Sequence, residues 1–335
     1  MAISDSLLSF VNADPSSSSS LASDDAAHAR RTIPTTTTQL PPGASILLTD
    51  SLAVSAQPWL VHFVSRALRP PPPSLHQQQQ QPGGPARVTR PQAARDAGAG
   101  GSGGKRKVIV LGVREREEWW TGVLKKSGIQ LATEKTSNHF NYFSLSDDPA
   151  TPLVESFARI RETISSSTTA AVTVDPDSDN AEVGPLVVLD DVSALGWMGH
   201  DLRDVLRFWN GLRSLLEPSR ATLVTLQHYA PAPASGIEED PVDTYLFRAL
   251  LQRSDLWLQV EPLGGASSTS GEISVHLAPA YLPIPPFAID PSCGALNASG
   301  PLARPFWVDE GAGGVEIGVK GRERIGGGGG ASKWA

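Results

Sequence analysis

The chain has 335 residues, a net charge of −7 at pH 7 and a pI near 5.5, which argues against a protein that coats nucleic acid through bulk positive charge. Its single cysteine, Cys293, excludes an intrachain disulfide and a metal site built from several cysteines, and it fits a reducing compartment. No apolar run approaches the roughly 20 residues that span a bilayer, and the first ten residues lack the pattern of a signal peptide.

Three segments have compositions that are typical of disorder. Residues 1–43 carry serine and threonine runs and few large apolar side chains, so burial cannot offset their ordering entropy, and we predict a disordered N-terminal segment. A stretch at about residues 70–104, rich in Pro, Gln, Gly and Ala, is interpreted as a disordered insertion in a surface loop, because closure entropy grows slowly with loop length. Residues 321–335 are a predicted flexible tail. This leaves residues 44–320 as a single domain.

Strand and helix patterns alternate through that domain. Apolar runs predict strands at residues 46–49, 107–111, 140–145, 186–189, 221–226, 256–260, 273–277 and 315–319. Helical periodicity predicts helices from Trp59, over 115–126, over 153–164, over 201–216 and from Pro241, with the serine run after Ile164 ending the third. Alternation followed by strands without helices between them predicts an α/β fold, a mainly parallel sheet with an antiparallel edge and helices on both faces.

Two of these helices have a clear apolar face. In the helix over 201–216 the stripe is formed by Leu202, Val205, Leu206, Trp209, Leu212 and Leu216. In the helix from Pro241 the apolar face is formed by Val242, Tyr245, Leu246, Ala249 and Leu250. We expect both sets of side chains to be buried against the sheet.

The strand over 186–189 ends in two carboxylates, Asp190 and Asp191. It is similar to the Walker B strand of P-loop NTPases, in which a carboxylate holds Mg²⁺ or its water. In the other interpretation, which we favour, these residues begin a turn and sit in water. The phosphate loop G-x-x-x-x-G-K-S/T that would accompany the strand is absent from the chain.

The place of that missing loop is the segment between the first strand and the first helix. Residues 50–58 contain neither glycine nor lysine, and the degenerate positions are Ser51, Ala56, Gln57 and Pro58. Glycines let backbone N–H groups approach phosphates and the lysine neutralises them. The segment therefore predicts a structural relative of an ATPase rather than an ATPase.

Other polar groups each have two interpretations. Gln227 and His228 end a strand, where a polar residue can sense a γ-phosphate or can be a plain strand terminus, and we favour the second. Arg203 and Arg207 could contact phosphate or a neighbouring subunit, or form the solvated face of their helix. The candidate RNA contacts in and beside the insertion are Arg87, Arg90, Arg95, Lys105, Arg106 and Lys107, although a solvated linker is the favoured interpretation.

The sequence carries no further sign of chemistry. It has no zinc-ligand spacing, no G-x-S-x-G elbow and no dinucleotide fingerprint. We therefore predict no catalytic residue, no cofactor and no metal ligand.

The order of several segments resembles the Elongator complex protein 6 family. The similar segments are Ile46–Ser51, Trp59–Phe63, Val187–Leu195, Leu223–His228 and Leu250–Leu258, which cover most of residues 44–277 without the insertion. The resemblance implies a RecA-like three-layer sandwich that lacks an intact P-loop, in an inactive homologue of the RecA-like ATPases. Residues 279–306 and the insertion depart from the family and inherit nothing from it.

The resemblance also implies partners. Members of the family form a heterohexameric ring with Elongator complex proteins 4 and 5; the ring binds tRNA and docks on the catalytic Elongator subunits, which begin modification of wobble uridine. We therefore expect a structural subunit of the cytoplasm, and of the nucleus as well, without membrane contact. Two alternatives stay open, namely an ATPase with a degenerate phosphate loop and a free-standing adaptor that acts through its Pro-rich segment.

Overall fold

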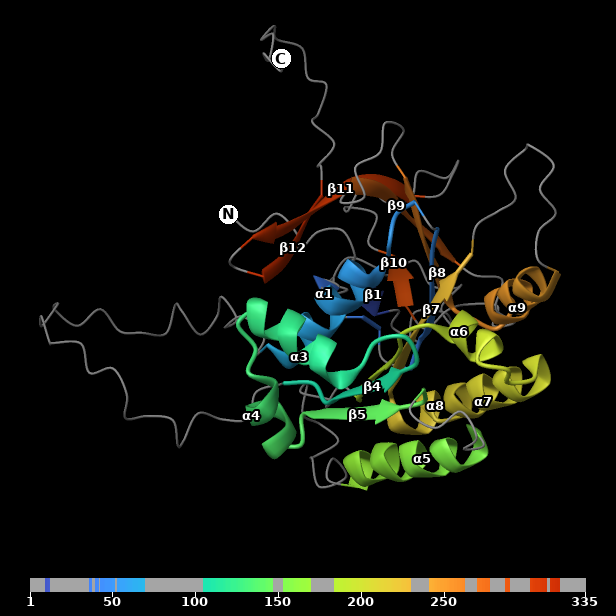
Figure 1. The fold of residues 1–335 in the computed structure, drawn as a ribbon. Coiled ribbons are helices and arrows are strands. Elements are labelled where there is room, and N and C mark those ends of the chain that lie inside the picture. Colours follow the sequence, from blue (N-terminus) through green and yellow to red (C-terminus); the bar gives the residue numbers. More distant parts are fainter. Residues whose placement is uncertain are drawn as a thin grey trace, which may run out of the picture.

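A nine-stranded sheet forms the centre of the computed structural model (Figure 1). The structure describes residues 10–12, 36–37, 40–41, 43–51, 53–69, 105–146, 153–169, 184–229, 241–262, 270–277, 287–289, 302–311 and 314–319. The strand order is β12-β11-β9-β8-β3-β7-β6-β4-β5. Most of the predicted insertion, of the N-terminal segment and of the tail lies outside the described residues, so the predicted domain organisation stays a prediction.

Six consecutive strands of this sheet are parallel, as the sequence predicts. They are β3 (Ser45–Asp50), β4 (Val108–Gly112), β5 (Phe140–Ser144), β6 (Leu186–Leu189), β7 (Thr222–His228) and β8 (Leu256–Pro262). Strand β7 lies between β3 and β6, and its register pairs His228 with Asp50. The residues that end these three strands therefore meet at one edge of the sheet.

The other strands form the predicted antiparallel edge. Strands β9 (Ser270–Leu277), β11 (Leu302–Gly311) and β12 (Gly314–Val319) extend the sheet from β8 through antiparallel pairs. The sequence does not predict β11, because Pro305 within the run argues against a strand that pairs on both sides.

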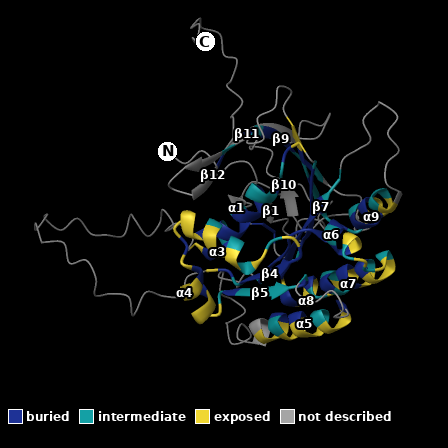
Figure 2. Cartoon of the chain, in the orientation of Figure 1, coloured by how far each residue is buried: buried dark blue, intermediate teal, exposed yellow. Residues whose placement is uncertain are grey.

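Helices cover both faces of the sheet, which gives three layers. On one face lie α1 (Gln57–Leu68), α3 (Glu117–Lys126) and α4 (Leu131–Thr136). On the other lie α5 (Leu153–Thr169), α6 (Val192–Trp197), α7 (Leu202–Ser214), α8 (Leu216–Ser219) and α9 (Pro241–Leu251). Strand β3 shows the alternation that this requires: Ile46 and Leu48 pack in the first cluster and Leu47 in the second. The central strands β3, β4, β6 and β7 and the inward helix faces are buried (Figure 2). The predicted sandwich is confirmed in its layers, parallel centre and antiparallel edge.

Some predicted element boundaries are wrong. Helix α5 continues to Thr169, past the serine run that was expected to end it at Ile164, and the short helices α4 and α6 were not predicted. A separate three-stranded sheet joins β1 (Phe10–Asn12), β2 (Thr36–Thr37) and β10 (Phe287–Ile289), although the sequence predicts no strand in any of these segments. Within the described residues, no helix combines the length and apolarity needed to cross a membrane.

Candidate functional site

Polar side chains meet where β3, β6 and β7 end. Asp50 is the last residue of β3, Asp190 and Asp191 follow β6, and His228 ends β7. In open parallel sheets this carboxyl edge is where ligands bind. The arrangement is therefore the first place to look for a functional site in this chain.

Asp50 closes the segment that stands in place of a phosphate loop. Its Oδ2 accepts the backbone N–H of Ala56 at 2.8 Å, immediately before α1, and the residue is 1% exposed. Ser51 and Val54 pair across the turn, and Val54 and Ala56 are buried. A carboxylate and apolar side chains of the chain itself thus fill the start of α1, where free N–H groups would be needed to bind phosphate.

The degenerate loop positions divide between the turn and the helix. Ser51 lies in the turn and Ala56 is the N-cap residue of α1. Gln57 and Pro58 are the first two residues of α1, so the helix begins two residues before the predicted Trp59. The Gln57 side-chain amide donates to Glu115 Oε1 at 2.6 Å, which ties the start of α1 to the segment after β4.

Asp190 holds the segment that follows β4. Its oxygens accept the backbone N–H groups of Val113, Arg114 and Glu115 at 2.6, 3.1 and 3.0 Å. Burial raises the pKa of Asp190 to about 6, against these three hydrogen bonds, which lower it. The carboxylate therefore holds the segment after β4 against the end of β6.

Asp191 caps helix α6. Its Oδ1 accepts the N–H groups of Ser193 at 3.0 Å and Ala194 at 3.2 Å. Asp190 and Asp191 connect β6 directly to α6, and the expectation that they sit in water is wrong, because they are 2% and 0% exposed.

His228 joins the carboxylates across the strand ends. Its Nδ1 pairs with Asp50 Oδ1, and its Nε2 lies 3.1 Å from Asp191 Oδ2. The hydrogen bonds to Asp191 and then Asp50 raise the pKa of His228 to about 10, against desolvation by burial. The imidazolium therefore links β3, β6 and β7 through charge-assisted contacts.

Arg114 contacts the same ring nitrogen. Its Nη1 lies 2.7 Å from His228 Nε2, and its Nε lies 3.5 Å from Glu115 Oε1. Nε2 cannot donate to Asp191 and accept from Arg114 at once. When His228 carries both protons it donates to the two carboxylates, and Arg114, which is partly exposed, keeps its ion pair with Glu115.

Two further residues frame this edge. Trp197, 65% exposed, stacks on His228 with ring centroids 6.4 Å apart. Gly112, at the end of β4, lies so close to the Tyr142 hydroxyl that an added Cβ would be 2.0 Å from it, and this hydroxyl donates to the Glu115 carbonyl oxygen. A side chain at position 112 would displace Tyr142, which explains the glycine there.

We call Asp50, Asp190, Asp191, His228 and Arg114 the strand-end network. Gln227 and the tryptophans of α3 lie apart from it. The Gln227 side chain is buried and its amide donates to the Asp243 carbonyl oxygen at 3.4 Å, toward α9. Trp120 is buried in the core, while Trp119 packs against it edge-on and stays partly exposed.

The candidate RNA contacts have different environments. Arg87, Arg90 and Arg95 lie outside the described residues. Lys105 pairs with Glu134 at 2.8 Å and stays partly exposed, and burial lowers the pKa of Lys107. Arg106 is 5% exposed and donates to the carbonyl oxygens of residues 184 and 185 and to a threonine hydroxyl. The prediction that Arg106 contacts RNA is wrong, because its guanidinium is buried and hydrogen-bonded inside the domain.

The sequence patterns do not identify Asp50 and Arg114 as members of the strand-end network. One signal could have found Asp50: it ends a predicted strand, as Asp190 and His228 do, and parallel strands bring such ends together. Nothing in the sequence indicates the Arg114 contact. Among the described residues, no group of three or more His, Cys, Asp or Glu side chains could hold a metal ion.

Comparisons with known proteins find a remote likeness to a solved structure. No protein-family model matches the chain, and no curated protein does. Among solved structures, the chain is similar to the KaiC-like protein PH0186 from the hyperthermophilic archaeon Pyrococcus horikoshii OT3, with a TM-score of 0.44 and 9% sequence identity over 83% of this chain and 90% of that chain. A likeness of this size carries no argument about activity, ligand or assembly.

Proposed function

We propose that this chain is a non-catalytic structural subunit of the Elongator accessory ring, an inactive homologue of the RecA-like ATPases. The observation that carries the absence of catalysis is the position of Asp50, whose buried carboxylate accepts the Ala56 N–H at the start of α1. A nucleotide phosphate entering here would meet this carboxylate instead of free N–H donors. A phosphate placed against this buried carboxylate would be repelled by its like charge.

The carboxylates are equally ill suited to hold Mg²⁺ for a nucleotide. Magnesium binds through one or two carboxylates together with substrate phosphates and water. Both oxygens of Asp190 accept N–H groups, and Asp191 caps α6 and pairs with His228. Binding a metal would therefore break contacts that hold the strand ends together.

The ring assignment rests on the sequence resemblance. Elongator complex proteins 4 and 5 would be its neighbours, and tRNA would be bound by the assembled ring, which docks on the catalytic subunits. Residues 193–200 and 229–240 follow the central strands and would face the pore in such a ring. The first segment lies mostly in α6, and the second carries Glu238, Glu239 and Asp240 and no basic residue, so the partner subunits would supply most of the positive charge.

Two measurements test the two parts of this proposal. Titration calorimetry of the isolated chain with Mg-ATP should show no micromolar binding, and such binding would instead support the degenerate ATPase. Co-expression with Elongator complex proteins 4 and 5, followed by mass measurement of the intact assembly, should give a hetero-oligomer that contains all three. A monomer without ring partners would instead favour the free-standing adaptor.

A further inference from the structure

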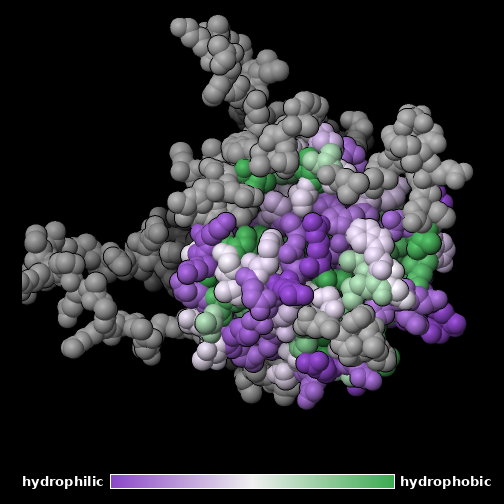
Figure 3. Space-filling model, viewed as in Figure 1, coloured by the Kyte–Doolittle hydropathy of each residue, from purple (hydrophilic) through white to green (hydrophobic). Residues whose placement is uncertain are grey.

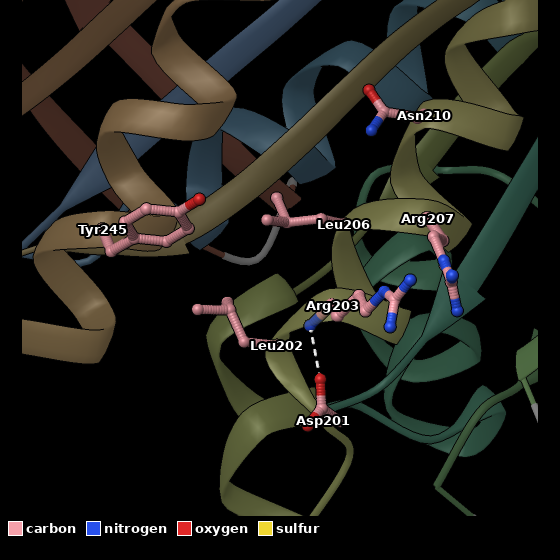
Figure 4. A pocket seen from close by; sticks show the side chains of 7 residues that line it. All are labelled: Asp201, Leu202, Arg203, Leu206, Arg207, Asn210 and Tyr245. Carbon is pink, nitrogen blue, oxygen red and sulfur yellow. Dashed lines mark hydrogen bonds between the residues drawn. The ribbon is translucent and has the colours of Figure 1, made fainter.

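A groove of about 450 Å³ lies between α7 and α9, on the helical layer away from α1. Seven side chains line it: Asp201, Leu202, Arg203, Leu206, Arg207, Asn210 and Tyr245. Figure 4 shows Leu202 and Leu206 between the Tyr245 ring and the two arginines. None of these residues belongs to the strand-end network.

The apolar part of this groove is exposed against expectation. The sequence predicts Val242 and Tyr245 on the buried face of α9, but they are 50% and 59% exposed, and only Leu246, Ala249 and Leu250 of that face are buried. Leu202 and Leu206 are likewise only partly buried on α7. Strongly hydrophobic surface is visible over α9, at the right of the view in Figure 3. Exposed apolar side chains that gather beside charged ones mark interaction sites.

The charged part of the groove holds two arginines beside the Asp201 and Asp204 carboxylates, and the arginines are only weakly engaged. Arg207 pairs with Asp204 at 3.3 Å, but both side chains are exposed, and an ion pair of this kind stabilises little. The guanidinium of Arg203 forms no hydrogen bond or ion pair with the described part of the chain; only its backbone N–H is engaged, with Asp201. Arg203 can therefore accept a carboxylate from outside without losing an existing contact.

We propose that the α7/α9 groove docks an acidic amphipathic helix of a partner protein. Arg203 and Arg207 are four residues apart, which is about 6 Å along a helix, and Leu202 and Leu206 repeat that spacing beside them. A partner helix with carboxylates at i and i+4 and aliphatic side chains on the adjoining stripe matches both rows. Arginine suits this pairing because its guanidinium binds carboxylates in a bidentate manner.

The same groove is a poor site for nucleic acid. The Asp201 carboxylate lines it, and Asp204 is held beside Arg207. With Asp204 included, the groove has one carboxylate for each arginine, so it lacks the accumulated positive charge that supplies most of the affinity for a phosphate backbone. Tyr245 is the one aromatic side chain among the lining residues, so there is no row of stacking platforms for successive bases.

Docking at this groove does not depend on ring assembly or on nucleotide binding. Its residues make no contact with Asp50, Asp190, Asp191 or His228 among the hydrogen bonds and ion pairs of the described residues. Failure of the ring proposal would leave the groove testable in the isolated chain.

The test uses the full chain and a displayed library of helical peptides with randomised exposed positions. Selected peptides should be enriched in Glu or Asp at i, i+4 spacing beside Leu, Ile or Phe, and fluorescence anisotropy should give micromolar affinity. Arg203→Glu with Arg207→Glu should weaken that binding at least tenfold, and Tyr245→Ala severalfold. The matched control, Lys126→Glu with Arg161→Glu, reverses two exposed charges on other helices and should leave affinity unchanged.

A rescue experiment makes the result specific to charge pairing. A selected peptide with its acidic positions changed to lysine should bind the Arg203→Glu, Arg207→Glu variant better than the native chain. Selection without acidic enrichment, or affinity that the double variant leaves unchanged, overturns the proposal. The proposal is also overturned if a single-stranded oligonucleotide binds the native chain with micromolar affinity and the double variant loses that binding. The groove would then bind nucleic acid.

Discussion

At the carboxyl edge of the sheet, Asp50, Asp190 and Asp191 are buried and accept hydrogen bonds from the chain's own N–H groups, whereas between α7 and α9 Arg203 and Tyr245 face solvent. In many α/β proteins of this architecture the carboxyl edge receives the ligand. Here the donors of that edge are satisfied internally, and the uncommitted charge and apolar surface lie on the outer helices. This difference supports the proposal of a non-catalytic subunit that binds its partners through the outer helices.

Helix α7 has a buried face and a face that lines the groove, and a substitution on the buried face, Trp209→Asp, should have the largest effect on stability. Trp209 is fully buried and its indole N–H donates to Thr225 Oγ1 at 2.9 Å. Losing this packing and burying a charge should cost about 4 kcal/mol or more, which is a large part of a typical domain's stability. We expect insoluble protein or a greatly lowered unfolding midpoint in urea.

Leu206→Asp is the matched change on the same helix. The sequence places Leu206 on the same apolar stripe as Trp209 and predicts that both are buried, but Leu206 lines the groove and is only partly buried. We therefore expect Leu206→Asp to lower the free energy of unfolding by only about 1 kcal/mol. Equal loss in the two variants would mean that the groove side of α7 is packed against something.

Asp50→Ala should have the next largest effect, because the network at the sheet edge depends on it. The substitution removes one of two carboxylates that face His228 and leaves the buried Ala56 N–H without its acceptor. We expect a loss of about 3 kcal/mol in the free energy of unfolding. Asp204→Ala, which removes an exposed carboxylate, should change it by less than about 0.5 kcal/mol, and comparable losses would show that the network is not structural.

The same network predicts how stability depends on pH. The pKa of His228 is raised in the folded chain to about 10 from an ordinary 6.5, so its contribution is complete below pH 6.5 and is lost as pH rises toward 10. Since burial also raises the pKa of Asp190, to about 6, that residue favours the folded state as pH falls below 6, in the same direction. Urea unfolding between pH 7 and 10 should show stability falling by a few kcal/mol.

His228→Gln provides the control for that pH profile. This variant should be less stable at pH 7 and nearly flat from pH 7 to 10, because glutamine does not titrate. A native profile that is equally flat would show that His228 is not held as a cation between the two carboxylates.

The sequence predicts the interior of this molecule better than its edges. Apolar runs such as 186–189 and the periodicity around Trp209 indicate burial directly, and the layers, the parallel centre and the antiparallel edge follow from them. The role of Asp190 and Asp191 was half predicted: their place at a strand end is visible in the sequence. Their burial is not, because Asp190 accepts the N–H groups of Val113–Glu115, about 75 residues away, and Asp191 faces His228 at the end of another strand.

The errors arise where a pattern is compatible with two environments. Arg106 belongs to a basic run, yet a single arginine in such a run can turn inward when carbonyl oxygens lie within reach, as those of residues 184 and 185 do. Val242 and Tyr245 fit the apolar face of α9 by spacing, but they are exposed, whereas Leu246, Ala249 and Leu250 further along that face are buried. A single sequence records side-chain type and spacing, and neither decides these cases.

Deleting residues 72–103 should have a small effect on the fold. The two ends of this segment are held together, since the Arg106 N–H donates to the Ala67 carbonyl oxygen at 2.9 Å and Arg69 donates to the Ser127 carbonyl oxygen at 2.8 Å. A shorter connection lowers the entropy of the unfolded chain, so stability should stay unchanged or rise by at most about 2 kcal/mol. A melting temperature lowered by many degrees would show that the deleted segment packs on the domain.

The smallest expected effect concerns tRNA binding by the assembled ring, which rests on the proposed function. The change replaces with glutamine the basic residues of and beside the insertion that remain candidates, namely Arg87, Arg90, Arg95, Lys105 and Lys107. Lys105 is already partly neutralised by Glu134, and burial favours the neutral form of Lys107, so we expect affinity to fall only about two- to threefold, or less than about 1 kcal/mol. Each lost phosphate contact should also flatten the slope of log affinity against log salt by somewhat under one unit.

Arg106→Gln, which disrupts an interior hydrogen-bond cluster, should instead lower the melting temperature of the chain. Filter binding across a salt series, with melting curves for both variants, separates the two behaviours. Unchanged affinity and slope in the five-residue variant would remove this segment from the RNA site and leave the subunit as a scaffold for its neighbours.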